Sequence, residues 1–204
     1  YQINVEALRA AQPKDLDASE IEVRLGATWI DRSYIKQFMF ETFDTPRYLR
    51  YSMDVQYSPY TAAWSISSKA RISYNDVAAW NTYGTDCVSA YEILEDSLNL
   101  RDVQVFDTIE DADGKKKRVL NAKETTLAAQ KQQLIRDAFK DWIWADPQRR
   151  QALVRQYNEE MNSTRPREYD GRHIVFAGMN PEITLREHQR NAIAHVLYGG
   201  NTLL

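Results

Sequence analysis

Histidine, cysteine and paired carboxylates supply most catalytic and metal sites, but this sequence does not group them in that way. Its three histidines are His173, His188 and His195, and Cys87 is its one cysteine. His188 and His195 are seven residues apart, whereas two metal ligands on a helix are normally four apart with a third ligand nearby. The acidic runs EDADG and NEEMN are typical of turns and solvated helix faces. We therefore predict no metal site and no catalytic residue in this chain.

Two groups of basic side chains could neutralise DNA phosphates without reading the base sequence. One follows an Asp-Gly pair at the expected tip of a β-hairpin and the other lies in an expected extended linker: Lys115, Lys116, Lys117 and Arg118, and Arg165, Arg167 and Arg172. The net charge of -3 provides no global attraction to nucleic acid, so DNA contact is expected to be local. A basic hairpin tip could also wedge a duplex. A solubilising turn is an equal alternative for the tip, because acidic EDAD precedes the lysines and can pair with them.

The C-terminal segment carries a pattern connected with nucleotide binding, although GxxxxGK[ST] and GxGxxG are both absent from the chain. Leu185, Arg186 and Gln189 form Leu-Arg-x-x-Gln, and a Gly-Gly pair and the apolar run Thr202-Leu-Leu follow. This pattern resembles the segment before the phosphate loop of superfamily-two helicases, particularly the Swi/Snf-type DNA-dependent ATPases. The resemblance implies that Gln189, with Arg186, helps to bind ATP, since an amide can pair with the adenine edge as donor and acceptor. Without it, Gln189 is read as a solvent-facing helix residue.

The resemblance also implies that the phosphate loop begins just after residue 204, so we expect the sequence to be a piece cut from a longer polypeptide. Three longer stretches are AKETTLAAQKQQLIRDAFKDWIW, YNEEMNSTRPREYDG and GMNPEITLREHQRNAIAHVLYGGNTLL. They are similar to the pre-helicase region of large methylase-helicase fusion proteins of bacterial conjugative elements and phages. This similarity implies a parent with a DNA methyltransferase and a helicase-like ATPase, which use S-adenosylmethionine and ATP with Mg²⁺. No cofactor is expected in the fragment itself.

Two functions are favoured by these features, and a free-standing enzyme comes last because no catalytic group of residues is present. The first is a non-catalytic, accessory DNA-handling region whose partners are DNA, weakly or only in the intact parent, and the other domains of the polypeptide. The second is a structural module that docks the methylase to the ATPase, or binds another protein, through Phe139, Trp142, Ile143 and Trp144. These residues cover more than one narrow helical stripe. They could equally form the chain's own core.

Hydrophobic periodicity and capping residues predict an α+β fold, with a small antiparallel sheet and a β-hairpin in a mixed N-terminal part and a helical C-terminal third. The expected helices cover 3–12, 32–43, 86–98, 122–145, 147–162 and 184–198, and the expected strands cover 21–25, two or three segments within 48–73, and the hairpin 102–108 and 116–121. We divide the chain into an α+β accessory domain (1–121), a helical hairpin (122–163), a basic linker (164–183) and the start of an ATPase core (184–204).

The cysteine content and the lack of long apolar runs bear on the cellular compartment of the protein. One cysteine cannot form an internal disulfide, which favours a reducing environment. The sequence has no run of 18 apolar residues and no signal-peptide pattern. We therefore expect a cytoplasmic protein without membrane contact.

Overall fold

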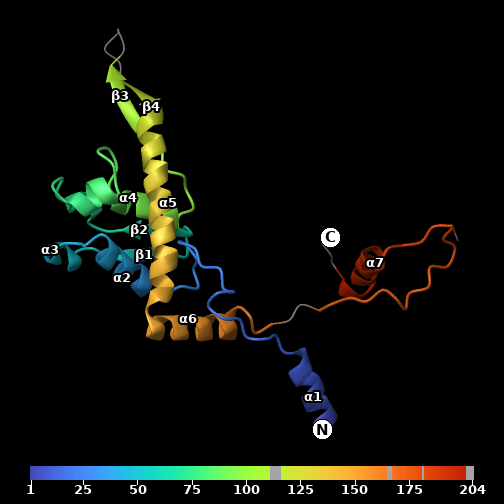
Figure 1. Cartoon of the computed structure of the whole chain (residues 1–204). Coiled ribbons are helices and arrows are strands. Elements are labelled where there is room, and N and C mark those ends of the chain that lie inside the picture. The colour runs from blue at the N-terminus through green and yellow to red at the C-terminus, as the bar shows by residue number, and fades with distance from the viewer. Residues whose placement is uncertain (111–115, 165–166, 181, 201–204) are drawn as a thin grey trace. The chain divides into compact units, whose positions relative to one another are not determined.

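The computed structural model describes residues 1–110, 116–164, 167–180 and 182–200. It divides into two compact units, which are treated separately below (Figure 1). One unit is Asp15–Met161, and the other combines Tyr1–Lys14 with Asn162–Leu204. The expected division between residues 121 and 122 falls inside the first unit, because the helix that starts there contributes to the core of that unit.

The unit Asp15–Met161 contains five α-helices and two separate pairs of antiparallel strands among its described residues, which confirms the α+β class. The helices are α2 (Arg32–Thr42), α3 (Arg47–Arg50), α4 (Ala90–Leu98), α5 (Ala122–Ala145) and α6 (Pro147–Glu160). Strand β1 (Val55–Ser58) pairs with β2 (Ala63–Ile66), and β3 (Phe106–Glu110) pairs with β4 (Lys116–Leu120). Single turns of 3₁₀ and π helix cover Lys69–Arg71 and Ala78–Thr82. In the other unit the helices are α1 (Gln2–Ala11) and α7 (Glu187–Gly199).

Helix α5 is the longest element, and α2, α4 and α6 all pack against it. The Oδ1 of Asn121 accepts a hydrogen bond from the backbone N–H of Glu124 at 3.0 Å, which caps the first turn as predicted. Its buried residues recur every three or four positions, as expected for a helix with one core face: Ala128, Gln132, Ile135, Phe139 and Ile143. Asp146 caps the following helix and Pro147 occupies its first position, so α6 also begins where the sequence predicted it.

The core is built around aromatic rings that lie between α2 and α5. Phe38 of α2 meets Phe139 and Trp142 of α5 edge to face, with ring centroids 5.1 Å and 5.6 Å apart. Phe43 continues this cluster to Tyr91 of α4 at 5.2 Å. The helices α2, α4 and α5 are thereby joined into one hydrophobic core.

Several expected boundaries were wrong. The segment 21–25 forms no strand, although Ile21, Val23 and Leu25 are buried as the alternation predicted. An irregular segment can bury alternate side chains without a backbone partner, and β1 and β2 pair with each other. Helix α4 begins at Ala90 rather than residue 86, because Ser89 and Glu92 form a reciprocal capping box. Within 48–73 two strands are present as expected, but the short helix α3 occupies its first residues.

Among the described residues, the helices include none that combines the length and the apolar character needed to cross a bilayer.

Candidate nucleic-acid interface

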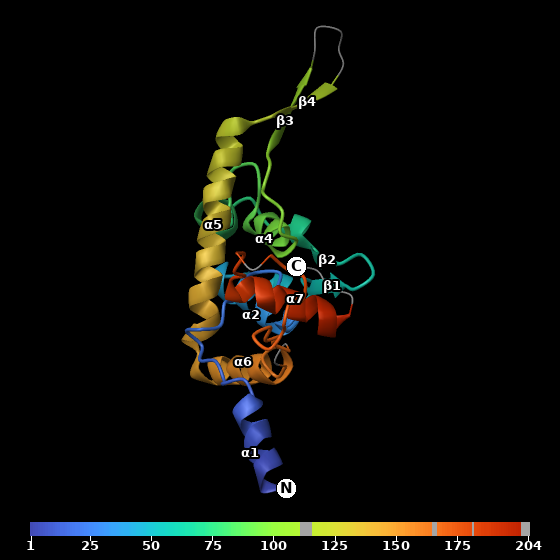
Figure 2. The same cartoon turned by 90° about the vertical axis from the view of Figure 1, so that its right-hand side faces the viewer.

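The β3–β4 hairpin projects beyond the Asn121 end of α5, as the two views in Figures 1 and 2 show. Its strands are in register from the pair Phe106 and Leu120 to the pair Glu110 and Lys116. Every residue of both strands is exposed. The hairpin, which the sequence predicted, therefore offers its two faces to a partner instead of burying one in the core.

The base of the hairpin is fixed to α5 by hydrogen bonds. The backbone N–H of Val105 donates to Thr125 Oγ1 at 3.0 Å, and the Val105 carbonyl accepts from the N–H of Asn121 at 2.9 Å. The side chain of Asn121 also donates to Asp107 Oδ2 at 2.9 Å. Val103 and Val105 are buried beneath these bonds. The exposed strands are thus held at their base by the core of the unit.

The three described cations of β4 lie on both faces of the hairpin. Lys116 and Arg118 share one face, because side chains alternate along a strand, and Lys117 lies on the other. Lys116 stands opposite Glu110, whereas Lys117 and Arg118 stand opposite Ile109 and Thr108. A carboxylate therefore faces only the first of the three, so pairing within the described strands leaves two cations available. Lys115 lies outside the described residues.

Arg118 is oriented by an aromatic ring. Its guanidinium carbon lies 4.5 Å from the centroid of the Phe106 ring on the neighbouring strand. A guanidinium stacked on an aromatic face keeps its N–H donors free at the edge. The Arg118 side chain is therefore held against the hairpin with its charged end exposed.

The predicted linker arginines belong to the other unit, and Arg165 lies outside the described residues. Arg167 stacks on Tyr169, with 5.1 Å between the guanidinium carbon and the ring centroid. Arg172 Nε donates to Asp170 Oδ1 at 3.2 Å, and an Nη of Arg172 lies 3.9 Å from a carboxylate oxygen of Glu187. The backbone N–H of Arg172 also donates to Asp170, and together with the guanidinium it holds the pKa of that carboxyl below its usual range. Two carboxylates thus offset the charge of Arg172.

The residues expected to help bind ATP lie at the start of α7, and both are exposed. Gln189 Oε1 accepts a hydrogen bond from the backbone N–H of Arg186 at 2.9 Å. This bond uses one of the two lone pairs of the amide oxygen, so it does not prevent the amide from pairing with an adenine edge as donor and acceptor. ATP binding by Arg186 and Gln189 stays a prediction. The expected strand from Thr202 lies outside the described residues.

The expected docking face on α5 is largely part of the core. Phe139 and Ile143 are buried, and Trp142 and Trp144 pack against the core as half-buried side chains. The indole Nε1 of Trp142 donates to Glu41 Oε2 at 2.7 Å, so α2 holds this side chain as well. The aromatic residues that extend beyond one narrow stripe are accommodated because α2 and α6 both pack on α5.

Other candidate chemistry is limited in the described part of the chain. No cluster of three or more His, Cys, Asp or Glu side chains there is arranged to hold a metal ion. Cys87 lies at the surface. Partial desolvation of its sulfur, together with the negative charges of Glu124 and Asp107, raises the pKa of the Cys87 thiol. A protonated thiol is a weak nucleophile, so Cys87 is not activated at neutral pH.

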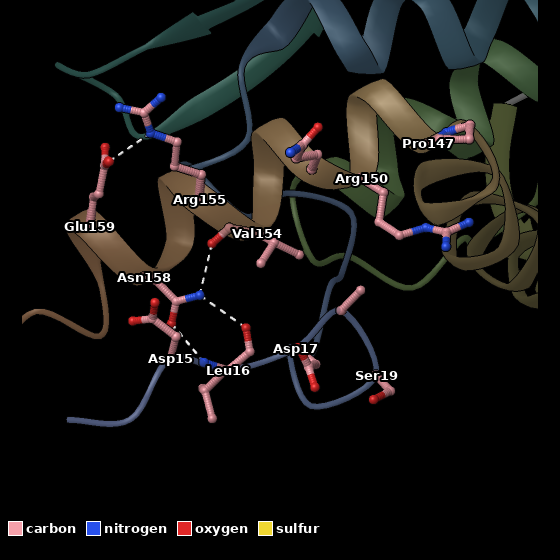
Figure 3. Close-up of a pocket in the computed structure, with 12 residues that line it drawn as sticks. Asp15, Leu16, Asp17, Ser19, Pro147, Arg150, Val154, Arg155, Asn158 and Glu159 are labelled. Carbon is pink, nitrogen blue, oxygen red and sulfur yellow. Dashed lines mark hydrogen bonds and ion pairs between the residues drawn. The ribbon is translucent and has the colours of Figure 1, made fainter.

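One surface feature has no linear sequence signal. A groove of about 950 Å³ lies between the 15–19 loop and α6 (Figure 3). Asn158 joins its two sides, because its Oδ1 accepts from the N–H of Leu16 at 2.8 Å and its Nδ2 donates to the carbonyl of the same residue at 2.9 Å. Arg155 pairs with Glu159 at 2.7 Å along one edge. The groove is lined by both arginines and carboxylates. The hydrogen bonds of Asn158 attach the 15–19 loop to α6.

The comparisons with known proteins identify a family. A family model described as "Domain of unknown function (DUF8437)" matches residues 24–163, more than two thirds of the chain. The chain belongs to this family. No curated protein and no solved structure matches it. The match covers α2 to α6 and the whole β3–β4 hairpin, so the hairpin belongs to the family's own region.

Proposed function

We propose that this DUF8437 chain is a non-catalytic, DNA-handling region of a larger cytoplasmic DNA-dependent ATPase or helicase that also carries a DNA methyltransferase. The observation that carries the DNA contact is the exposed β3–β4 hairpin, with cations on both of its faces and its base fixed to α5. A narrow ribbon of this kind can enter between strands or lie in a groove while phosphates are neutralised on either side. The proposal of an ATPase rests on the resemblance of the C-terminal segment to superfamily-two helicases.

The structure reduces the support for the alternative, a docking module. Its proposed contact residues on α5 are buried or already packed, so a partner could not reach Phe139 or Ile143 without unfolding the core. The hairpin offers a contact surface that requires no such rearrangement. We therefore favour the DNA-handling function.

The DNA contact is tested with a triple variant, K116A/K117A/R118A, in the 204-residue chain. Binding of labelled duplex and forked DNA is measured by fluorescence anisotropy between about 50 and 200 mM salt. We expect weaker binding to every sequence, and a salt dependence that falls by up to about 0.9 log units for each lost phosphate contact. Thermal unfolding should be unchanged, because exposed surface substitutions typically alter stability by about 0.5 kcal/mol or less.

A matched control removes three exposed arginines from other parts of the same unit, in the variant R32A/R47A/R71A. It changes the net charge equally but leaves the hairpin intact, so its affinity and salt dependence should stay close to those of the unmodified chain. If both triple variants lose the same affinity, the hairpin is not the site. Unchanged binding in the hairpin variant would leave a solubilising turn as the explanation of its lysines.

The proposed parent is tested by the encoding gene. We expect the reading frame to continue beyond Leu204 and to encode a glycine-rich loop ending in Gly-Lys-Thr within about ten residues. A stop codon directly after Leu204 would refute the ATPase assignment but would leave the hairpin test unaffected.

A further inference from the structure

A second basic feature lies on the same unit as the hairpin. A pocket of about 420 Å³ is enclosed by the 22–25 segment, the end of α4 and the middle of α5. Its floor includes the buried residues Leu25 and Ser97. Three basic side chains line it, together with a single carboxylate from Glu22: Arg24, Arg136 and Lys140. The pocket is therefore electropositive in a chain that is acidic overall.

Little within the described residues compensates these three cations. Arg136 lies 3.8 Å from Asp102 Oδ1, and that aspartate side chain is 93% exposed. A long, solvated ion pair of this kind contributes little. Arg24 and Lys140 make no ion pair with a described residue. Glu22 and Asp102 thus offset the three positive charges only in part, and a bound anion would relieve the remaining repulsion.

The remaining polar groups of the pocket favour an anion as well. The last carbonyls of α4 are occupied, since those of Glu95, Asp96 and Ser97 accept from backbone N–H groups of the following turn. The hydroxyl of Ser97 donates to the Ile93 carbonyl and accepts from Gln132 Nε2. The free groups at the rim are mainly donors, and a guanidinium fork matches the paired oxygens of a phosphate.

We propose that this pocket binds a backbone phosphate of the DNA strand that the β3–β4 hairpin engages, a step that rests on the proposed DNA-handling function. Its volume of about 420 Å³ leaves room for the sugar that accompanies a backbone phosphate. In Figures 1 and 2 the hairpin extends from one end of α5, and α4, which borders the pocket, lies along the same helix. One duplex following α5 would pass both features.

The length of DNA required follows from the elements between the two sites. The path from Ala122 to Arg136 along α5 is roughly 21 Å at 1.5 Å per residue. The path along β4 from Lys116 to Asn121 adds roughly 17 Å at 3.3 Å per residue. The sum is about 38 Å, or about 11 base pairs at 3.4 Å each. This path length is the largest possible separation of the two sites, so a duplex of about 20 base pairs can reach both, whereas one of about 8 base pairs spans only about 27 Å of it.

The test compares R24A/R136A/K140A with the charge-matched control R32A/R47A/R71A in the 204-residue chain. The unmodified chain and the control should bind a 20-base-pair duplex about tenfold or more tightly than an 8-base-pair duplex, because the second contact is then intramolecular. The pocket variant should lose most of this gain, and its salt dependence on the longer duplex should fall by about 0.9 log units. Equal loss in the two variants, or an unchanged gain in the pocket variant, would overturn the proposal.

A second experiment distinguishes a DNA backbone phosphate from free inorganic phosphate as the ligand of the pocket. The Nε–H signals of Arg24 and Arg136 are followed by NMR during titration with inorganic phosphate and with the 20-base-pair duplex. Shifts of these two signals with the duplex, without matching shifts of the Nε–H signals of the exposed Arg32 and Arg47, support the proposal. Shifts with inorganic phosphate alone would overturn the DNA occupant and assign the pocket to free phosphate. If the hairpin variant fails to alter DNA binding while the pocket signals still respond to the duplex, the proposed hairpin contact fails and the pocket site stands.

Discussion

Replacing Tyr91 by Phe gives a direct test of the core, because the effect should change sign with pH. Tyr91 is fully buried, and its hydroxyl lies 2.8 Å from Thr45 Oγ1. Either hydroxyl can donate in this pair, and the carbonyl of Met39, 3.2 Å from Thr45 Oγ1, can accept the Thr45 proton instead. Burial, only partly offset by the Thr45 hydrogen bond, raises the pKa of Tyr91 from 10.0 to about 12.

The sign of the stability change follows from linkage. The folded state holds the neutral phenol more tightly than the unfolded state, so the stabilisation is fully present below pH 10 and is lost as the pH rises towards 12. A difference of two pKa units corresponds to about 2.7 kcal/mol in total, and about 1.4 kcal/mol of this is lost by about pH 11.

The variant Y91F cannot titrate at this position. Near pH 8 it should be about 1 kcal/mol less stable than the unmodified chain, because the hydrogen bond to Thr45 is lost. By about pH 11 Y91F should be about 0.4 kcal/mol more stable than the unmodified chain. Only the unmodified chain has then lost about 1.4 kcal/mol of stability, because Tyr91 ionises in its unfolded state. Urea unfolding followed by tryptophan fluorescence measures this difference. The control Y60F changes a tyrosine that is 98% exposed and should show no pH-dependent difference. A constant difference between Y91F and the unmodified chain at all pH values would refute the reasoning.

Substitutions of Arg149 and of two glycines test how the elements are held together. Arg149 is buried, and its guanidinium carbon lies 3.6 Å from the ring centroid of Trp142. R149A should therefore lower the free energy of unfolding, measured by urea denaturation, by roughly 3 kcal/mol. R149K should have an intermediate effect. Gly26 has a φ of +87°, and a Cβ there would lie 2.3 Å from the carbonyl oxygen of Leu98. G26A should therefore cost at least about 2 kcal/mol, whereas G178A, with a φ of +85° and open space around it, should cost about 1 kcal/mol. Equal shifts in unfolding midpoint for the two glycine variants would show that the contact with Leu98 is not the cause.

Capping residues made the C-terminal helices of the larger unit predictable. Asn121 and Asp146 each accept a hydrogen bond from the first turn of the helix they precede, and Pro147 fits only at a helix start. These signals are local in sequence, so they can be recognised without knowing the fold. The β3–β4 hairpin was predicted for the same reason, since strand-like segments flank an Asp-Gly pair.

The misplaced elements depended on contacts that a local pattern does not contain. The alternation at Ile21, Val23 and Leu25 reports burial, but a strand also requires a backbone partner, which that segment lacks. The start of α4 was decided by Ser89 and Glu92 together, because each satisfies a backbone N–H of the other. An acidic residue a few positions earlier gave a weaker signal of the same type.

The basic pocket illustrates the limit of motif reading for sites. Its cations come from residues 24, 136 and 140, which lie in segments far apart in the sequence. Arg24 stands in an irregular segment, and the two α5 cations resemble ordinary solvated helix positions. Only the fold brings them around one cavity. The hairpin cations, in contrast, form a continuous run that composition alone reveals.

The β3–β4 hairpin contributes little to the core of its unit. Its strands bury no residue, and Phe106, Ile109, Val119 and Leu120 are 39 to 51% exposed. An isolated two-stranded ribbon is marginally stable in water, so the ribbon depends on its bonds to Asn121 and Thr125. Those bonds fix where the hairpin leaves the core but add no cover to its faces. A partner that neutralises the cations and covers the apolar side chains would supply the stabilisation that the rest of the unit does not.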